Sequence, residues 1–257
     1  MSTASARRRL TSLVLLALVS GCAVAMPPPR APVAPEARRA VALLITRWHE
    51  FSDLRALADI VLARGAEQQR FTGVLLAAAP GSVRFEALSP FGQPLLVATV
   101  HAGQLTAYDA ATNEAVVGPA DARTTAELLH LPFDPDDLVA VLAGLAVPPD
   151  DLRLAEIQPP DEHGPSLLMI GAVHQQRVWM DLETGRVDHL EITGGRAAAR
   201  VSFRRDAAGV LTGFDLAAGD GHVTGAVRYR NLVVDSGVDA ERFTLTLPKD
   251  AKTRSIR

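Results

Sequence analysis

The side chains that could support catalysis or metal binding are few in this sequence. His163, His174 and His189 fall within one region, but their spacing matches no common metal site, and alternating strand positions need not converge. The acidic pairs Asp136-Asp137 and Asp150-Asp151 are typical of solvated helix starts and turns rather than of an acid–base pair. Gly-x-Ser-x-Gly and phosphate-loop motifs do not occur. We therefore expect neither enzymatic activity nor a cofactor.

Cys22, the only cysteine in the chain, indicates a different chemistry. Arginines at 7–9 precede an apolar stretch, 10–19, that is too short to cross a bilayer as a helix, which is the pattern of a cleaved secretory signal. The end of that stretch, Val19-Ser20-Gly21-Cys22, resembles the lipobox of bacterial lipoproteins, in which the signal is cut before a lipidated cysteine. The alternative is a chance cysteine within a cleaved signal. We expect a signal peptide over residues 1–21 and a lipid on Cys22.

The residue after Cys22 is Ala23 rather than aspartate, which in Gram-negative lipoproteins implies release to the outer membrane. The expected location is the periplasmic face of that membrane. Residues 22–35 are rich in proline and alanine and form a semi-stiff tether. Residues 36–257 then make one domain, long enough to bury a core.

The composition of the chain limits the kinds of partner that it is expected to bind. A net charge of −3 provides no basic field, so nucleic acid is not an expected partner. Hydrophobic residues make up 48% of the chain but aromatic residues only 5%, so the interior must consist mainly of leucine, valine and alanine. Such an interior suits a smooth aliphatic lining, although a GC-rich genome would produce the same bias.

Hydrophobic periodicity predicts the elements. Apolar residues spaced by three and four predict an amphipathic helix over 36–53. A period of two predicts strands over 57–64, 70–78, 83–88, 94–101, 104–109, 114–117, 152–157, 166–172, 176–182, 187–193, 197–204, 212–216, 222–231 and 243–247. Helices are expected between the two groups of strands, at 120–131 and 135–142.

The short connections leave no room for crossover helices, so the strands should form an antiparallel meander. A sheet of this size tends to curl. The predicted fold class is mainly β (α+β): a large curled antiparallel sheet forming a half-barrel, with the N-terminal helix and the two inserted helices as a lid over its concave face.

An aromatic residue occupies an unusual place in the turn Ser89-Pro90-Phe91-Gly92. Turns of this type ordinarily carry polar residues. A phenylalanine there either folds back onto its own sheet or contacts an apolar partner.

These features together resemble the LolA/LolB superfamily of periplasmic lipoprotein carriers and receptors, in particular its lipid-anchored LolB side. The matching parts are Cys22 with its signal, the turn at 89–92, the segment 120–144 with its Leu-Pro-Phe-Asp-Pro-Asp-Asp-Leu core and Leu142-Ala143-Gly144 end, and the closing strand pair. Related families of outer-membrane lipoproteins share this pattern, which covers most of the mature chain.

The resemblance implies a function. In LolB proteins the half-barrel holds the acyl chains of a lipoprotein handed over by the soluble carrier LolA. A hydrophobic residue at the tip of the Asn/Ser-Pro-x-Gly turn helps to insert that cargo into the outer membrane. The tip position falls on Phe91, with Pro90 beside it, so both are expected to contact the membrane. The expected partners are the outer membrane, the acyl chains of other lipoproteins and a soluble LolA-like carrier.

Periodicity alone places the large apolar residues that would line the cavity, although plain core packing would use the same positions. They are Leu75, Phe85, Leu96, Leu128, Leu138, Leu142, Met169, Trp179 and Leu190. The sequence departs from the family pattern in its short link at 65–69 and in its scarcity of aromatic lining residues, which leaves a different apolar ligand open. A second function also stays open: a tethered envelope-assembly module with a filled interior.

Overall fold

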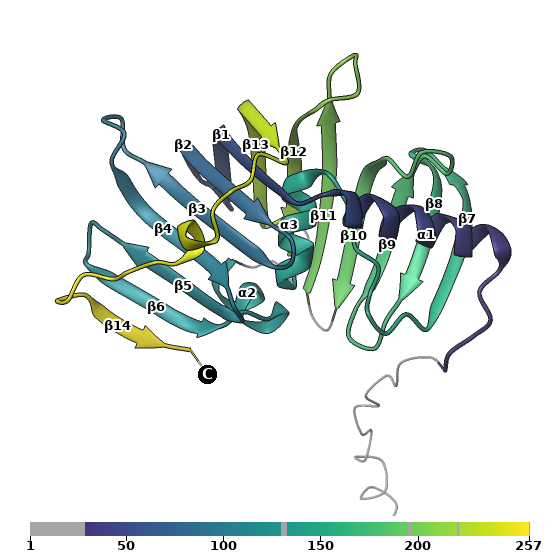
Figure 1. The fold of residues 1–257 in the computed structure, drawn as a ribbon, viewed down its shortest axis with the longest axis horizontal. Coiled ribbons are helices and arrows are strands. Elements are labelled where there is room, and N and C mark those ends of the chain that lie inside the picture. Colours follow the sequence, from purple (N-terminus) through teal and green to yellow (C-terminus); the bar gives the residue numbers. More distant parts are fainter. Residues whose placement is uncertain (1–28, 130–132, 195–196, 220, 257) are drawn as a thin grey trace, which may run out of the picture.

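The computed structural model describes residues 29–129, 133–194, 197–219 and 221–256 (Figure 1). The predicted signal peptide and lipidation site, Cys22, lie outside the described residues, as does most of the predicted tether. These three assignments therefore stay predictions.

One sheet of 14 strands dominates the structure, in the order β14-β6-β5-β4-β3-β2-β1-β13-β12-β11-β10-β9-β8-β7. Its first seven strands in the chain are β1 (Asp53–Arg64), β2 (Glu67–Ala78), β3 (Ser82–Leu88), β4 (Pro94–His101), β5 (Gln104–Asp109), β6 (Glu114–Pro119) and β7 (Leu154–Asp161). The others are β8 (Gly164–Ile170), β9 (Gln175–Met180), β10 (Val187–Gly194), β11 (Ala197–Arg205), β12 (Leu211–Ala218), β13 (Val223–Val234) and β14 (Lys252–Ser255). The sheet is antiparallel except where β14 pairs with β6, and it does not close. The predicted fold class is confirmed.

The N-terminal helix α1 (Pro35–Glu50) crosses in front of β7 to β10 (Figure 1). It begins at a proline, where a missing N–H group is harmless, and buries Ala37, Ala40, Val41 and Leu44 along one face. Near its other end, Arg47 Nε donates to the Thr184 carbonyl in the β9–β10 turn at 3.0 Å. The helix thus covers the end of the sheet formed by β7 to β10 (Figure 1).

The short helix α3 (Pro135–Ala143) packs on the middle of the sheet. It ends at Gly144, which adopts the left-handed conformation (φ 71°) that favours glycine after a helix. The Tyr229 hydroxyl of β13 donates to the Leu142 carbonyl at 2.7 Å, and Arg205 of β11 donates to the Gly144 carbonyl at 3.1 Å. The face of the sheet that carries Tyr229 is called the helix-covered face below.

The other inserted helix, α2 (Ala122–Leu129), lies beside β6. Its Thr124 Cγ2 is 3.3 Å from where a Cβ of Gly118 would stand. The two helices predicted as a lid therefore occupy different places, and α3 is the one held by β11 and β13. Residues 130–131 of the predicted helix lie outside the described residues.

The predicted end of the N-terminal helix and the predicted last strand were wrong, and the first strand begins at Asp53 rather than at 57. The N-terminal helix ends at Glu50 rather than at 53, because Asp53 is already paired in β1 and its carboxylate accepts from the Ser236 and Gly237 backbone N–H groups. The predicted strand at 243–247 does not form. Its first residue, Phe243, instead ends the 3-10 helix η1 (Ala240–Phe243), and the last strand is β14.

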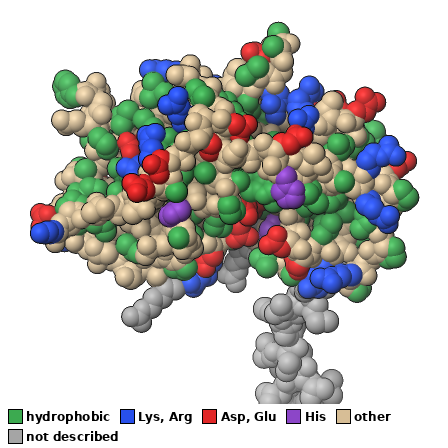
Figure 2. All heavy atoms as spheres, in the orientation of Figure 1, with side chains coloured by type: hydrophobic (Ala, Val, Ile, Leu, Met, Phe, Trp, Pro, Cys, Tyr) green, Lys and Arg blue, Asp and Glu red, His purple; other side chains and the backbone are tan. Residues whose placement is uncertain are grey.

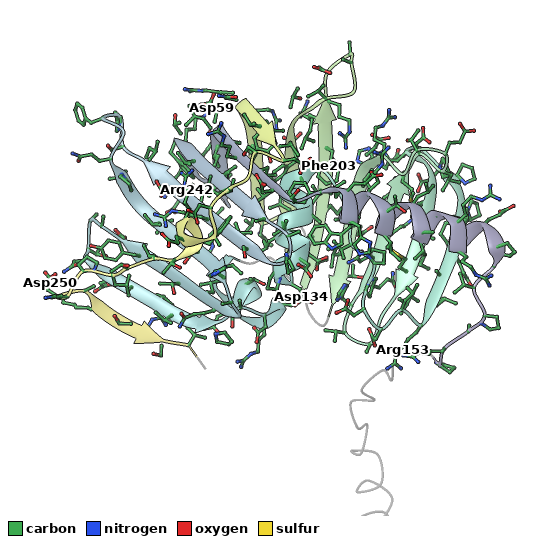
Figure 3. The ribbon with its side chains drawn as sticks, viewed as in Figure 1. Asp59, Asp134, Arg153, Phe203, Arg242 and Asp250 are labelled. Carbon is green, nitrogen blue, oxygen red and sulfur yellow. The ribbon has the colours of Figure 1, made fainter. Side chains whose placement is uncertain are left out.

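The segment from η1 to β14 crosses the opposite face of the sheet, over β3 and β4 (Figure 1). Phe243 is 2% exposed and stacks on His101 of β4, with ring centroids 6.0 Å apart. Arg84 of β3 donates to the Arg242 carbonyl at 3.1 Å; Arg242 and Asp250 mark the course of this segment in Figure 3. The alternation of apolar and polar residues over 243–247 is typical of a strand. In the structure, however, Phe243 packs against the sheet and holds this segment in place.

We expect Tyr229→Phe to lower the free energy of unfolding by about 1–2 kcal/mol, because the Leu142 carbonyl would lose its buried donor while the ring keeps its packing. Urea denaturation measures this change. Tyr108→Phe is the matched control, since the Tyr108 hydroxyl donates to Asn113 on a distant, half-buried turn. An equal effect of the two variants would contradict a fastening role for Tyr229.

Candidate functional site

The loop between β3 and β4 carries the most exposed large apolar side chain among the described residues. Phe91 is 91% exposed, and its loop projects at the upper left of Figure 1, where Figure 2 shows a hydrophobic group at the tip. Its ring therefore does not fold back onto the sheet.

The loop holds its shape through its own hydrogen bonds. Ser89 Oγ accepts from the backbone N–H groups of Phe91 at 3.3 Å and of Gln93 at 3.1 Å, and Gly92 N–H donates to the Ser89 carbonyl at 2.9 Å. Gly92 has a φ of 78°, which glycine adopts without strain. Pro90 restricts the remaining turn position and is exposed. The exposed ring is thus presented on a preformed turn.

Beside this loop, the helix-covered face carries apolar side chains that are only partly buried. We call Leu62, Phe71, Phe85 and Leu96 the apolar strip; they come from β1, β2, β3 and β4. Leu62 is 42% exposed, and the rings of Phe71 and Phe85 lie 5.9 Å apart. Gly73 leaves room for the Phe85 ring on this face, because a Cβ at that position would stand 2.7 Å from Ile60 Cδ1 and 3.0 Å from Phe85. The strip is the accessible apolar part of this face near Phe91.

The remaining cavity candidates lie deeper. Leu75 (5% exposed), Leu142 (9%), Met169 (0%) and Leu190 (2%) belong to one core cluster, and Leu138 packs partly buried against it. In the described structure Leu75, Leu142, Met169 and Leu190 are therefore buried in packed surroundings, and their role as cavity lining stays a prediction.

Trp179 was placed on the wrong face. Leu190 pairs with Val178 and His189 pairs with Trp179, so the tryptophan and Leu190 point to opposite sides of the sheet. The ring is covered there by Arg177, whose guanidinium carbon is 4.3 Å from the ring centre. Leu128 lies in α2, but its side chain is outside the described residues.

Asp137 is not a solvated helix-start residue, contrary to expectation. It is 5% exposed and accepts from Gln176 Nε2 at 3.1 Å and from the Asp134 N–H at 3.3 Å. Burial raises the pKa of this carboxyl to about 7. Gln176, 1% exposed on β9, leaves its Oε1 without a partner among the described residues. This buried pair ties α3 to β9.

The histidines converge in part. The rings of His163 and His189 lie 4.2 Å apart, whereas His174 contacts Gln176 at 3.1 Å on the other face. Burial and the neighbouring His163 lower the pKa of His189. Asp161 beside them accepts from Trp179 Nε1 and from Arg177. Across the described ranges, no group of three metal-ligating side chains comes together.

Asp150 is exposed in a turn, and Asp151 accepts from the Ala172 N–H at 3.0 Å, which holds the pKa of that carboxyl below its usual range. Asp161 beside the histidines and Asp151 in its turn thus each serve a local structural contact. Within the described part of the chain, none of the helices combines the length and apolar character needed to cross a membrane.

No protein-family model matches this sequence, and a comparison with curated proteins finds no match. The fold, however, is similar to several solved structures. A domain assigned to an outer membrane lipoprotein-sorting protein of Vibrio parahaemolyticus aligns at a TM-score of 0.55 and 13% identity, over 80% of this chain and 97% of its own.

Two further structures show the same likeness. A LolA superfamily protein from Nitrosomonas europaea aligns at a TM-score of 0.55 and 11% identity, over 82% of this chain and 99% of its own. A DUF1329 family protein from Desulfovibrio piger aligns at 0.57 and 12%, over 81% and 95% of the two chains. At these identities the likeness shows a shared fold.

Sequence reasoning missed Leu62 and Phe71 in the apolar strip. Phe71 stands next to Arg70 at the polar start of β2, which hid its alternation, and Leu62 lies among residues that are apolar on both faces of β1. The register Ile60↔Phe71 brings them together, and register follows from pairing rather than from local composition.

Proposed function

We propose that this protein is a lipid-anchored outer-membrane lipoprotein that binds acyl chains and receives and inserts other lipoproteins, as LolB does. The observation that carries the proposal is the preformed β3–β4 turn, which exposes Phe91 fully beside a partly exposed apolar strip. The LolA-like fold supports a role in lipoprotein sorting or elsewhere in the cell envelope. Non-covalent binding of this kind needs neither catalysis nor a cofactor.

The acyl chains are expected to enter along the apolar strip. A saturated chain gains roughly 0.8 kcal/mol for each methylene that leaves water, so even a few contacts with Phe71, Phe85 and Leu96 favour entry. Deeper seating requires α3 to move, since Leu142 is already buried. The anchor on Cys22 would keep the domain at the membrane that receives the cargo.

The test is binding of a triacylated lipopeptide or a fluorescent fatty acid to the chain from Ala23 onward, which contains every described element. We expect Leu96→Glu to weaken binding about tenfold or more, because a carboxylate on the strip would have to be desolvated against an acyl chain. Val210→Glu is the matched control: Val210 is also an exposed apolar residue (57%), but it lies in the connection between β11 and β12 rather than on β1 to β4. Binding that is absent in the wild type, or lost equally in both variants, would contradict the proposal.

A tethered assembly module is the second candidate, and the burial of Leu75, Leu142, Met169 and Leu190 favours it. A filled interior needs no ligand to be stable. A well-folded wild type that binds no lipid would support this function instead.

A further inference from the structure

A hollow of about 610 Å³ opens on the face opposite the helices, directly at the base of the Phe91 loop. Arg70, Thr72, Leu88 and Leu95 line it together with the loop residues Ser89 and Pro90. Ser89 and Pro90 belong both to the hollow and to the turn. The hollow therefore begins one or two residues before Phe91 in the chain, next to its exposed ring.

One cation in this hollow is unpaired. Arg70 is exposed, forms no ion pair with any described residue, and makes a single long hydrogen bond to Gln68 Oε1 at 3.4 Å. The carboxylate of Asp59, which also lines the hollow and is labelled in Figure 3, is held by two hydrogen bonds from Arg230, one of them from Nε at 2.8 Å. The acidic wall is therefore already neutralised, and the Arg70 guanidinium remains available to an anion.

The dimensions fit a membrane surface. Ser89 and Phe91 are two positions apart in a compact hydrogen-bonded turn, and the headgroup layer on each side of a bilayer is about 5–7 Å thick. If the Phe91 ring reaches the acyl boundary, Ser89 and the hollow behind it lie at the level of the lipid phosphates. Guanidinium groups bind phosphate oxygens through paired N–H donors.

We propose that this hollow binds the headgroup phosphate of an anionic lipid through Arg70 while Phe91 sits in the acyl region. The inference rests on the membrane contact of the proposed function and adds a lipid preference to it. The apolar rim of Leu88, Pro90 and Leu95 accommodates the glycerol end of the same lipid, and Arg70 supplies the charge complementarity.

The experiment compares binding of the chain from Ala23 onward to vesicles of phosphatidylcholine alone and of phosphatidylcholine mixed with phosphatidylglycerol. We expect Arg70→Gln to weaken binding to the anionic vesicles about five-fold, which corresponds to ~1 kcal/mol for one basic residue at an anionic surface, and to leave binding to phosphatidylcholine unchanged. The difference should shrink as salt is raised.

Arg55→Gln is the matched control. Arg55 is exposed on β1, on the same face of the sheet as Arg70, but it lies near the start of β1 whereas Arg70 pairs with Val61 near its end. Equal binding of the Arg70 and Arg55 variants to anionic vesicles would overturn the headgroup site. Phe91→Glu separates this outcome from failure of the proposed function: it should reduce binding to both kinds of vesicle, and wild-type binding by that variant would contradict membrane contact itself.

Discussion

Phe91→Glu is expected to abolish delivery of a lipoprotein into acceptor membranes while leaving the fold and the unfolding transition of the protein unchanged. The ring is 91% exposed and does not belong to the hydrophobic core, so its loss removes no core contact. Burial of a phenylalanine in lipid contributes about 1.5–3 kcal/mol, and a carboxylate at the same depth opposes insertion. The substitution therefore turns the proposed membrane contact at position 91 from a favourable one into an unfavourable one.

Transfer of a fluorescent triacylated lipopeptide from the loaded protein to vesicles measures this effect. Val173→Glu is the control, since Val173 is also a strongly exposed apolar residue (74%) but lies in the turn between β8 and β9, away from the β3–β4 loop. Wild-type transfer by the Phe91 variant would refute the assigned role of the loop. A loss shared by the Val173 variant would mean that general surface apolarity matters and the loop does not.

Asp137→Asn is expected to remove a pH dependence of stability that the wild type carries. The folded-state pKa is raised from 3.8 to about 7, so between these values the native protein holds a proton that the unfolded chain has released. Wild-type stability from this group is therefore fully present below pH ~4, falls as the pH rises, and is lost above pH 7. The full span is roughly 4 kcal/mol, since one pKa unit is equivalent to about 1.36 kcal/mol.

Asparagine resembles the protonated carboxyl, because it is neutral and its amide can donate a hydrogen bond. Once the side-chain amide of Gln176 is reversed, the amide of the introduced asparagine donates to Gln176 Oε1, which otherwise has no partner among the described residues. Urea denaturation of both proteins from pH 4 to 8 should show the wild type losing stability relative to the variant as the pH rises. Parallel curves would rule out the buried carboxyl as the source. Asp150→Asn, an exposed acidic residue nearby in the sequence, should leave the slope unchanged.

Most of the sheet was predictable from the sequence because strand alternation and turn residues are local signals. Gly65, Gly81 and Gly103 sit in turns with positive φ, where the sequence placed them. The last strand was not predictable: β14 is a four-residue segment, Lys252–Ser255, with charged residues and no apolar face, and it forms because β6 offers an open edge. The face of Trp179 was not predictable either, because Val178, Trp179 and Met180 are consecutive apolar residues, and their pattern alone does not say which of them lies on the helix-covered face.

The candidate site also contains both features that local sequence signals and features that depend on distant parts of the chain. The turn at 89–92 followed from residue types within four positions, although those residues left open whether Phe91 folds back or projects. The Asp137–Gln176 contact joins residues 39 positions apart, and no local pattern signals it. Acidic residues at a helix start are ordinarily solvated. Only the arrival of β9 against α3 buries this one.

An open sheet has two free edges, and each offers unpaired backbone groups to any passing strand. Here one edge strand, β7, carries Pro159 and Pro160, which have no backbone N–H to donate. Its pairing with β8 is irregular between Gln158 and Asp161. The other, β14, is short and places Lys252 and Arg254 in solvent. Both borders therefore resist strand addition and aggregation, so the curved sheet can remain open without polymerising edge to edge.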